Sequence, residues 1–230
     1  PAEGVRDAYR RVTKGAPDEL TVHCGLVTAP DGATKMVAVP LCHCGELAQA
    51  ETDVRPLREL GTPLLDELGP LPYVAQNRLS DEMLPRGALN YWKSAFFREL
   101  SDAAIATLLE CFEQVPSAMT LCVIEPMGGA AARVAPTATA YPHREPGYSL
   151  LILAQWSEPA DTPDNIAWAR DTFEALRPHM ADRRYMNYMS ADDGGYVHDA
   201  YGPNYERLVE IKQVYDPDNV FHLNQNIPPR

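Results

Sequence analysis

The sequence predicts an α+β fold in which helices cover one face of an antiparallel sheet. Three observations support this: two short apolar runs joined by a turn, amphipathic helices between the later runs, and one run that is apolar at almost every position. The 230 residues suffice for one large domain with a real core. The composition, 45% apolar and 23% charged, is that of an ordinary globular protein.

The first quarter of the chain supplies a hairpin and a helix. Residues 19–27 and 35–42 read as strands, because the turn-rich segment TAPDGAT separates two apolar runs. Residues 45–60 have a helical period, but Pro56 lies within them. Proline lacks an amide hydrogen and crowds the preceding turn, so we expect this helix to be kinked or split.

A proline-rich segment and a clear helix follow. Residues 61–93 contain Leu, Tyr and Trp among their prolines and glycines, which is typical of a functional loop or a cover and not of a linker. Residues 101–115 form the clearest helix, since Ser101 can cap its first turn and an apolar stripe runs along it.

Two strands and another helix come next. Residues 117–129 read as a strand ending in a turn, where Gly128 and Gly129 favour positive φ and no helix N-terminus follows to hold a phosphate. Residues 148–156 are apolar on both faces, which predicts a central strand. Residues 162–178 form a helix, capped by Thr162 with Pro163 at its first position.

The last 48 residues combine a helix with many hydrogen-bonding side chains. The helix spans 204–215, with Leu208, Ile211 and Val214 expected to face inward. The stretch YMNY reads as extended, which would place Tyr185 and Asn187 on one face. Taken alone, such alternation favours a half-buried aromatic strand.

Charge and cysteine content exclude several classes of function. A formal net charge of −12 argues against nucleic-acid partners, and no apolar run reaches membrane-spanning length. Five cysteines are too few and odd in number for a disulfide scaffold, so a cytoplasmic, bacterial setting is expected over secretion. The stretch 42–44, Cys-His-Cys, lacks a second ligand pair, so we expect no metal site there.

Several motifs in order along the chain resemble one family. They are PLREL at 56–60, GALNYWKS at 87–94, GGAAARV at 128–134, TATAYPHR at 137–144, IAWAR at 166–170 and the closing run with YMNY, AYGPNYERLVEIKQVYDPDNVF and LNQNI. Together they are similar to the C-terminal part of bacterial berberine-bridge-enzyme-like FAD-linked oxidases, of the vanillyl-alcohol oxidase superfamily. The resemblance covers essentially the whole chain.

The resemblance implies that two parts of the chain have different binding roles. Residues 1–182 would be a substrate-binding domain, and residues 183–230 a strand-helix segment that completes a FAD-binding domain. The N-terminal FAD-binding domain of the family is absent from this chain and would be its partner, besides a small-molecule substrate. We therefore expect the 230 residues alone to bind FAD weakly and to be inactive.

The resemblance also assigns roles to single residues. Tyr188 would be the catalytic base for a substrate hydroxyl, and Tyr185, Asn187 and Asn224 would contact FAD. A free tyrosine has a pKa of about 10, so this role needs a nearby cation or strong donors, for which Arg144 is the candidate.

The loop before strand 148–156 would contribute the substrate contacts Tyr141, His143 and Arg144. For Arg144 a surface ion pair, for His143 a structural role and for Asn224 a turn are the alternatives. On the strand itself, plant members carry polar catalytic side chains where Ser149, Leu151 and Leu153 stand here, so the substrate class does not carry over.

The implied function is oxidation of an alcohol or benzylic-type carbon of a carbohydrate or secondary metabolite, by hydride transfer to flavin. The alternative from another class is a flavin-free, stand-alone α+β module that binds a small molecule.

Overall fold

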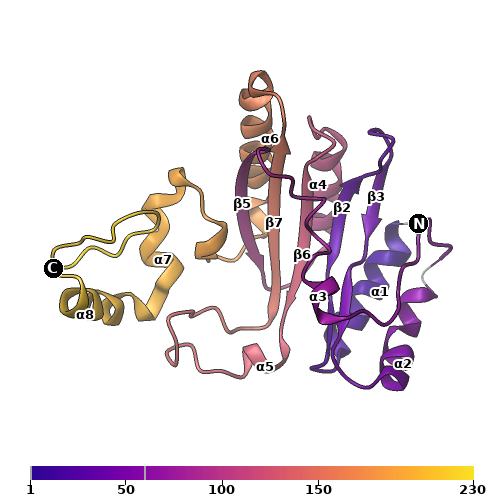
Figure 1. The fold of residues 1–230 in the computed structure, drawn as a ribbon, viewed down its shortest axis with the longest axis horizontal. Coiled ribbons are helices and arrows are strands. Elements are labelled where there is room, and N and C mark those ends of the chain that lie inside the picture. Colours follow the sequence, from indigo (N-terminus) through magenta and orange to yellow (C-terminus); the bar gives the residue numbers. More distant parts are fainter. Residues whose placement is uncertain (1, 60) are drawn as a thin grey trace.

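A five-stranded antiparallel sheet forms the centre of the computed structural model, which describes residues 2–59 and 61–230 (Figure 1). The strand order is β3-β2-β6-β7-β5, and β1 with β4 makes a separate two-stranded ribbon. The strands are β1 Leu20–Val22, β2 Cys24–Thr28, β3 Lys35–Ala38, β4 Leu41–His43, β5 Leu89–Phe97, β6 Leu121–Met127 and β7 Gly147–Trp156. The predicted hairpin is confirmed as β2 and β3, which pair antiparallel.

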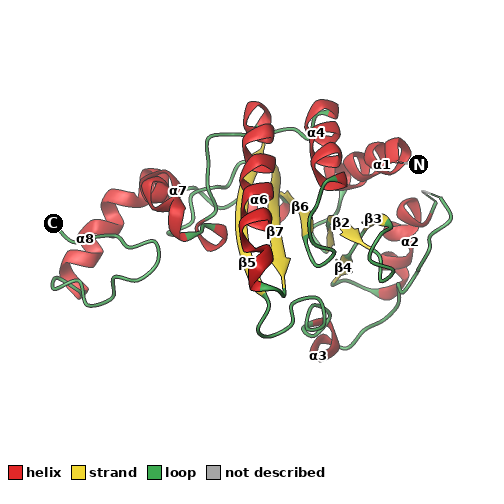
Figure 2. Ribbon diagram, turned by 90° about the horizontal axis from the view of Figure 1, so that it is seen from above, coloured by secondary structure: helices red, strands yellow, loops and turns green. Residues whose placement is uncertain are grey.

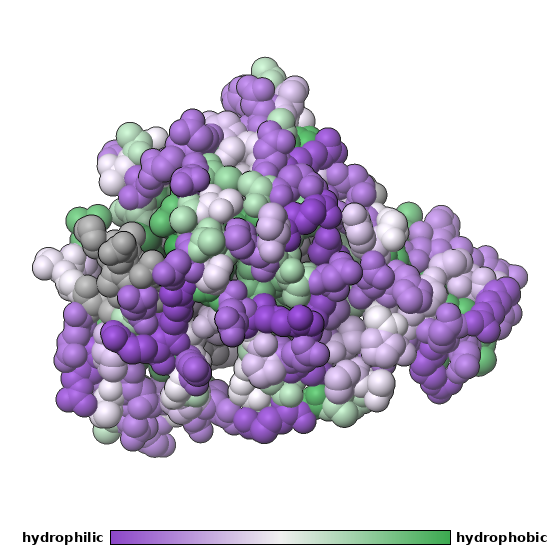
Figure 3. Space-filling model, turned by 180° about the vertical axis from the view of Figure 1, so that it is seen from behind, coloured by the Kyte–Doolittle hydropathy of each residue, from purple (hydrophilic) through white to green (hydrophobic). Residues whose placement is uncertain are grey.

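The long helices cover one face of this sheet, as predicted. They are α1 Ala2–Gly15, α4 Asp102–Glu113 and α6 Thr162–Leu176, and α2 Leu47–Arg58 packs against α1. Figure 2 shows α1 and α4 on one side of the sheet and the short helix α3, Tyr73–Gln76, on the other. The main hydrophobic core lies between the sheet and these helices. The exposed face seen from behind is mostly hydrophilic (Figure 3), in keeping with the negative net charge.

Strand β7 is central and apolar on both faces, as the sequence predicts. Its residues Leu150, Ile152 and Ala154 are fully buried in the core beneath the helices. Successive side chains of a strand point to opposite faces. Leu151 and Leu153 accordingly join a second cluster, with Leu121 and Trp92, on the other face of the sheet. We call this second side the open face.

Three helix predictions need correction. Helix α2 is not split: it continues through Pro56, which removes one amide hydrogen bond, and ends two residues later. Thr162 is the first residue of α6 and not its cap; Asp161 precedes it, and the Thr162 hydroxyl accepts a bond from the Trp156 indole instead. One helical turn, α5 Gly129–Ala132, does begin at the second glycine; Gly129 has φ 58° as expected, whereas Gly128 is extended, with φ −172°.

Two elements escaped prediction. Helix α1 was not foreseen, and β5 begins at Leu89, inside the segment 61–93 expected to be a loop. Strand β5 contains the polar residues Asn90 and Lys93, which hide its alternation. The final residue of the helix expected at 45–60, Leu60, lies outside the described residues.

The C-terminal segment lies beside the β5 edge of the sheet and carries α7 Val197–Tyr201 and α8 Tyr205–Tyr215 (Figure 1). The extended reading of YMNY is wrong, because Met186–Tyr188 is a 3-10 turn that brings Tyr188 back toward Tyr185. The inward face assigned to α8 is also wrong. Val209 is its buried residue, while Val214 is 71% exposed because no described element covers that face.

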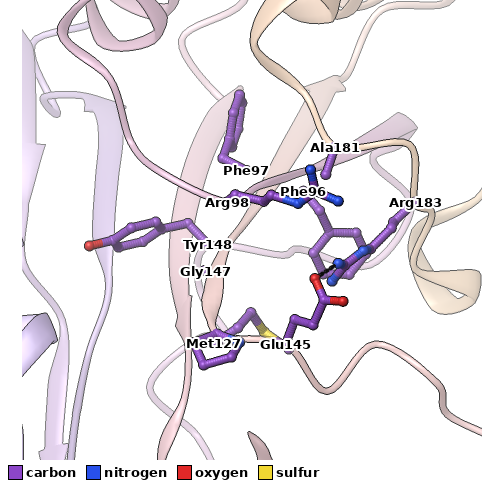
Figure 4. A pocket seen from close by; sticks show the side chains of 10 residues that line it. Phe96, Phe97, Arg98, Met127, Glu145, Gly147, Tyr148, Ala181 and Arg183 are labelled. Atoms are coloured by element: carbon purple, nitrogen blue, oxygen red, sulfur yellow. Dashed lines mark hydrogen bonds and ion pairs between the residues drawn. The ribbon is translucent and has the colours of Figure 1, made fainter. Parts of the chain in front are cut away.

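Short 3-10 helices connect these parts. They are Pro159–Asp161, Arg177–His179, Met186–Tyr188, Ala191–Tyr196 and Gly202–Asn204. Just before the C-terminal segment, the chain is tied to the sheet by a bridge between Phe96 and Ala181, next to a hollow of only about 10 Å³. Across that hollow the Arg183 guanidinium pairs with Glu145 (Figure 4). None of the described helices has the length and apolar character that crossing a membrane requires.

Candidate functional site

An aromatic hollow of about 210 Å³ lies between the loop before β7 and the C-terminal segment. Four of the predicted site residues line it: Tyr141, His143, Tyr185 and Asn187, together with Met186 and Tyr201. The Tyr141 and Tyr185 rings meet edge to face at 5.7 Å between centroids. Since edge-to-face packing is a favoured aromatic geometry, these rings form stable walls.

Buried hydrogen bonds position the loop that carries Tyr141 and His143. The Asn204 amide donates to the carbonyls of Pro136 and Thr139, at 2.8 and 3.0 Å. The His143 Nε2 atom lies 2.8 Å from the Arg184 carbonyl oxygen. Burial lowers the pKa of His143, although the bond to this carbonyl opposes the shift, so the imidazole is neutral at pH 7.

The Arg144 guanidinium packs against the Tyr141 ring. The Arg144 guanidinium lies 4.9 Å from the centroid of the Tyr141 ring and donates to the Thr139 hydroxyl at 2.8 Å. Burial, followed by the neighbouring Tyr185, raises the pKa of Tyr141 to about 12, and Arg144 only partly offsets this. The Tyr141 phenol is therefore a neutral hydrogen-bond donor at physiological pH.

Tyr188 sits next to the hollow, on the open face. Its ring contacts Tyr185 at 4.9 Å and Trp92 at 5.8 Å between centroids. Its hydroxyl donates to Glu125 Oε1 at 3.0 Å. Burial and then the charge of Glu125 raise the pKa of Tyr188, so the phenol stays protonated.

The expected pairing of Arg144 with Tyr188 is therefore wrong. The guanidinium is held by oxygens of its own loop, and a carboxylate, not a cation, is the partner of the Tyr188 hydroxyl. Sequence reasoning overlooked Glu125. Its signal was available, because alternation along β6 places Glu125 opposite the buried Cys122 and Ile124 and hence on the open face.

The predicted FAD contacts are only partly brought together. The Asn187 amide donates to the Tyr185 hydroxyl at 2.9 Å, so these two residues present one polar edge of the hollow. Asn224 is exposed, has φ 58° and is not among the lining residues. Its neighbour Gln225 donates to the Met189 carbonyl at 3.1 Å, which brings this part of the tail back to the residue after Tyr188.

The arrangement can stack or edge-contact a flat aromatic ligand and can move one proton. The rings of the hollow provide the aromatic surface, and the Tyr185–Asn187 pair provides donors and acceptors. In the Tyr188–Glu125 pair, the phenol can transfer its proton to a carboxylate. No described group of His, Cys, Asp and Glu side chains is arranged to hold a metal ion.

The same C-terminal segment carries the family match. Residues 184–228 match the family described as "Berberine and berberine like". Over this segment the chain is similar to berberine-bridge-enzyme-like proteins.

Beyond this segment the chain is similar to FAD-linked oxidoreductases, among them the uncharacterized protein YgaK of Bacillus subtilis. YgaK is 29% identical over 181 residues, which are 76% of this chain and 39% of YgaK. An FAD-linked oxidoreductase of Dictyostelium discoideum is 25% identical over 220 residues, which are 94% of this chain and 46% of that protein. The chain thus spans less than half the length of these curated relatives.

Solved structures share the fold. Berberine bridge enzyme from Eschscholzia californica superposes with a TM-score of 0.79 at 20% identity, over 100% of this chain and 52% of that one. A single-residue variant of berberine bridge enzyme in complex with (S)-reticuline gives a TM-score of 0.75 at 18% identity, over 98% of this chain and 52% of that one.

Proposed function

We propose that the intact protein is an FAD-dependent oxidoreductase that oxidises an alcohol or benzylic-type carbon of a carbohydrate or secondary metabolite. The observation that carries the proposal is the Tyr188–Glu125 pair beside an aromatic hollow, in a chain whose residues 184–228 match this family. Residues 1–182 would bind the substrate and residues 183–230 would contact the cofactor. The other FAD contacts would come from polypeptide outside these residues.

The residues of the hollow suit one edge of a flavin. Its walls are aromatic and its polar edge holds a phenol and a primary amide, which match a flat ring with a polar rim. Tyr185 and Asn187 would hold the cofactor there, with Asn224 joining from the returning tail. Tyr141, His143 and Arg144 would contact the substrate. When bound, FAD supplies the acceptor for a hydride from the substrate carbon.

The chain's own residues would manage the proton. Because its pKa is raised, Tyr188 is not ionised to a phenolate before the substrate binds. It would therefore accept the substrate proton only as it passes its own proton on. As the substrate hydroxyl gives its proton to Tyr188 Oη, the phenol proton passes to Glu125 Oε1 along the 3.0 Å hydrogen bond. The net change is one proton moved from substrate to Glu125.

Substitution of the pair tests this route. In the full-length protein, Tyr188→Phe and Glu125→Gln should each lower the rate of anaerobic flavin reduction by about 100-fold or more, as loss of general acid–base catalysis does. Tyr73→Phe is the matched control, because Tyr73 is 78% exposed and lies outside the hollow. Nearly unchanged flavin reduction in Tyr188→Phe would refute the role of Tyr188.

Cofactor content separates this proposal from the flavin-free alternative. Full-length protein that is yellow when purified, with absorption that alcohols bleach anaerobically, supports the oxidoreductase. Colourless protein that retains no flavin absorption after incubation with FAD and removal of the unbound cofactor supports a binding module.

A further inference from the structure

The segment after Tyr188 wraps around the outermost strand of the sheet. Strand β5 ends the strand order, so its free edge faces this segment. Tyr188 lies on the open face against Trp92, and the Ser190 hydroxyl donates to the Trp92 carbonyl at 2.7 Å at the edge itself. The neighbouring Lys93 points to the helix face, where it meets Asp193.

Lys93 and Asp193 form a buried ion pair. The Lys93 Nζ donates to Asp193 Oδ1 at 2.6 Å, and both side chains are only 8% exposed. The other carboxylate oxygen of Asp193 accepts the Ser190 amide at 2.9 Å. A continuous chain of contacts therefore joins Lys93 to a residue two positions after Tyr188.

A second carboxylate reinforces the pair. Asp192 accepts bonds from Lys93 at 3.2 Å, from the Tyr91 hydroxyl at 2.5 Å and from Arg170 of α6 at 2.9 Å. Burial alone would raise the pKa of Asp192, but these three donors hold it at about 2. Residues from β5, α6 and the C-terminal segment thus converge on one edge.

We propose that Lys93 and Asp193 are positioning residues for Tyr188, which they hold against Trp92 by clamping the following turn to the edge of β5. Lys93, Ser190, Asp192 and Asp193 together form an edge clasp. The effect of the edge clasp on turnover rests on the proposed function. Its effect on the position of Tyr188 is independent of that function. A buried cation tied to two carboxylates fixes geometry, since few alternative arrangements satisfy all its bonds.

Loss of the edge clasp should have one kinetic effect and one structural effect. In the full-length protein, Lys93→Met should lower kcat by about 10- to 100-fold, because a displacement of 1 Å can cost about 100-fold, while KM changes by less than about threefold. Hydrogen–deuterium exchange at 186–190 should become at least about tenfold faster, with exchange in β7 unchanged. Arg207→Met is the matched control, since it removes an exposed ion pair with Glu210 on α8.

Ser190→Ala covers the case in which Lys93→Met does not fold. It removes the bond to the Trp92 carbonyl without leaving a buried charge, and should accelerate exchange at 186–190 and lower kcat more than KM. If the folded variants keep wild-type kcat and wild-type exchange at 186–190, the positioning role is refuted. If wild-type protein lacks flavin and turnover, the proposed function fails, and the exchange data alone decide whether the clasp holds Tyr188.

Discussion

The Lys93–Asp193 pair allows a quantitative test by a double-mutant cycle. Lys93→Met removes the cation and leaves Asp193 buried with the Ser190 amide as its remaining partner. Breaking a buried ion pair from one side costs about 3–5 kcal/mol. Because Asp192 keeps Tyr91 and Arg170, we expect the lower end, about 3 kcal/mol.

The partner substitution should cost less. Asp193→Asn keeps an oxygen for the Ser190 amide and leaves Lys93 bonded to Asp192, so we expect the loss of one charged hydrogen bond, about 2 kcal/mol. In the double variant both charges of the pair are removed, so neither is left buried without its partner. Its destabilisation should then be about 3 kcal/mol instead of the additive sum of about 5, a coupling of about 2 kcal/mol.

Urea denaturation of the four proteins, followed by circular dichroism, measures the cycle. Equal m-values across the set would show that the same amount of surface unfolds in each protein. A coupling below about 0.5 kcal/mol, the range expected for independent sites, would refute the view that these two side chains form one buried unit.

Three further outcomes are expected. Because burial lowers the pKa of His143, the unfolded chain binds more protons below about pH 6.5. Stability should thus fall between pH 7 and 5, and this slope should be smaller in His143→Phe. Leu153→Ala, at a side chain 2% exposed on the open face, should cost about 2–5 kcal/mol in urea unfolding, whereas Val214→Ala should stay within about 0.5 kcal/mol. Ser101→Ala should lower the free energy of unfolding by about 1 kcal/mol, because its hydroxyl oxygen caps the Ala104 amide.

Local patterns predicted much of the fold and part of the site. The unbroken apolar run of β7 indicated a central strand, and Ser101 before an apolar stripe indicated the start of α4. The concentration of aromatic and amide side chains in the tail indicated a ligand-facing segment. Two of its members, Tyr185 and Asn187, do line the hollow.

Other features were misread because local patterns compete. Lys93 is a charged residue in a buried strand, and it is stable there only because two carboxylates come from a segment about 100 positions later. The alternation in YMNY suggested a strand, but residues 186–188 form a 3-10 turn in which the Tyr188 amide donates back to the Tyr185 carbonyl. Val214 fits the apolar side of α8, yet no described element covers it.

The amino-acid sequence by itself determined the α+β class, the helix-covered antiparallel sheet and the tail's concentration of hydrogen-bonding side chains. Those properties follow from periodicity and capping, which act between residues close in the chain. Only the tertiary structure decided that Glu125, and not Arg144, receives the bond from Tyr188, and that Lys93 holds the turn behind it. Hydrogen bonds between residues 63 to 100 positions apart depend on how the sheet and the tail pack, and no local pattern encodes that distance.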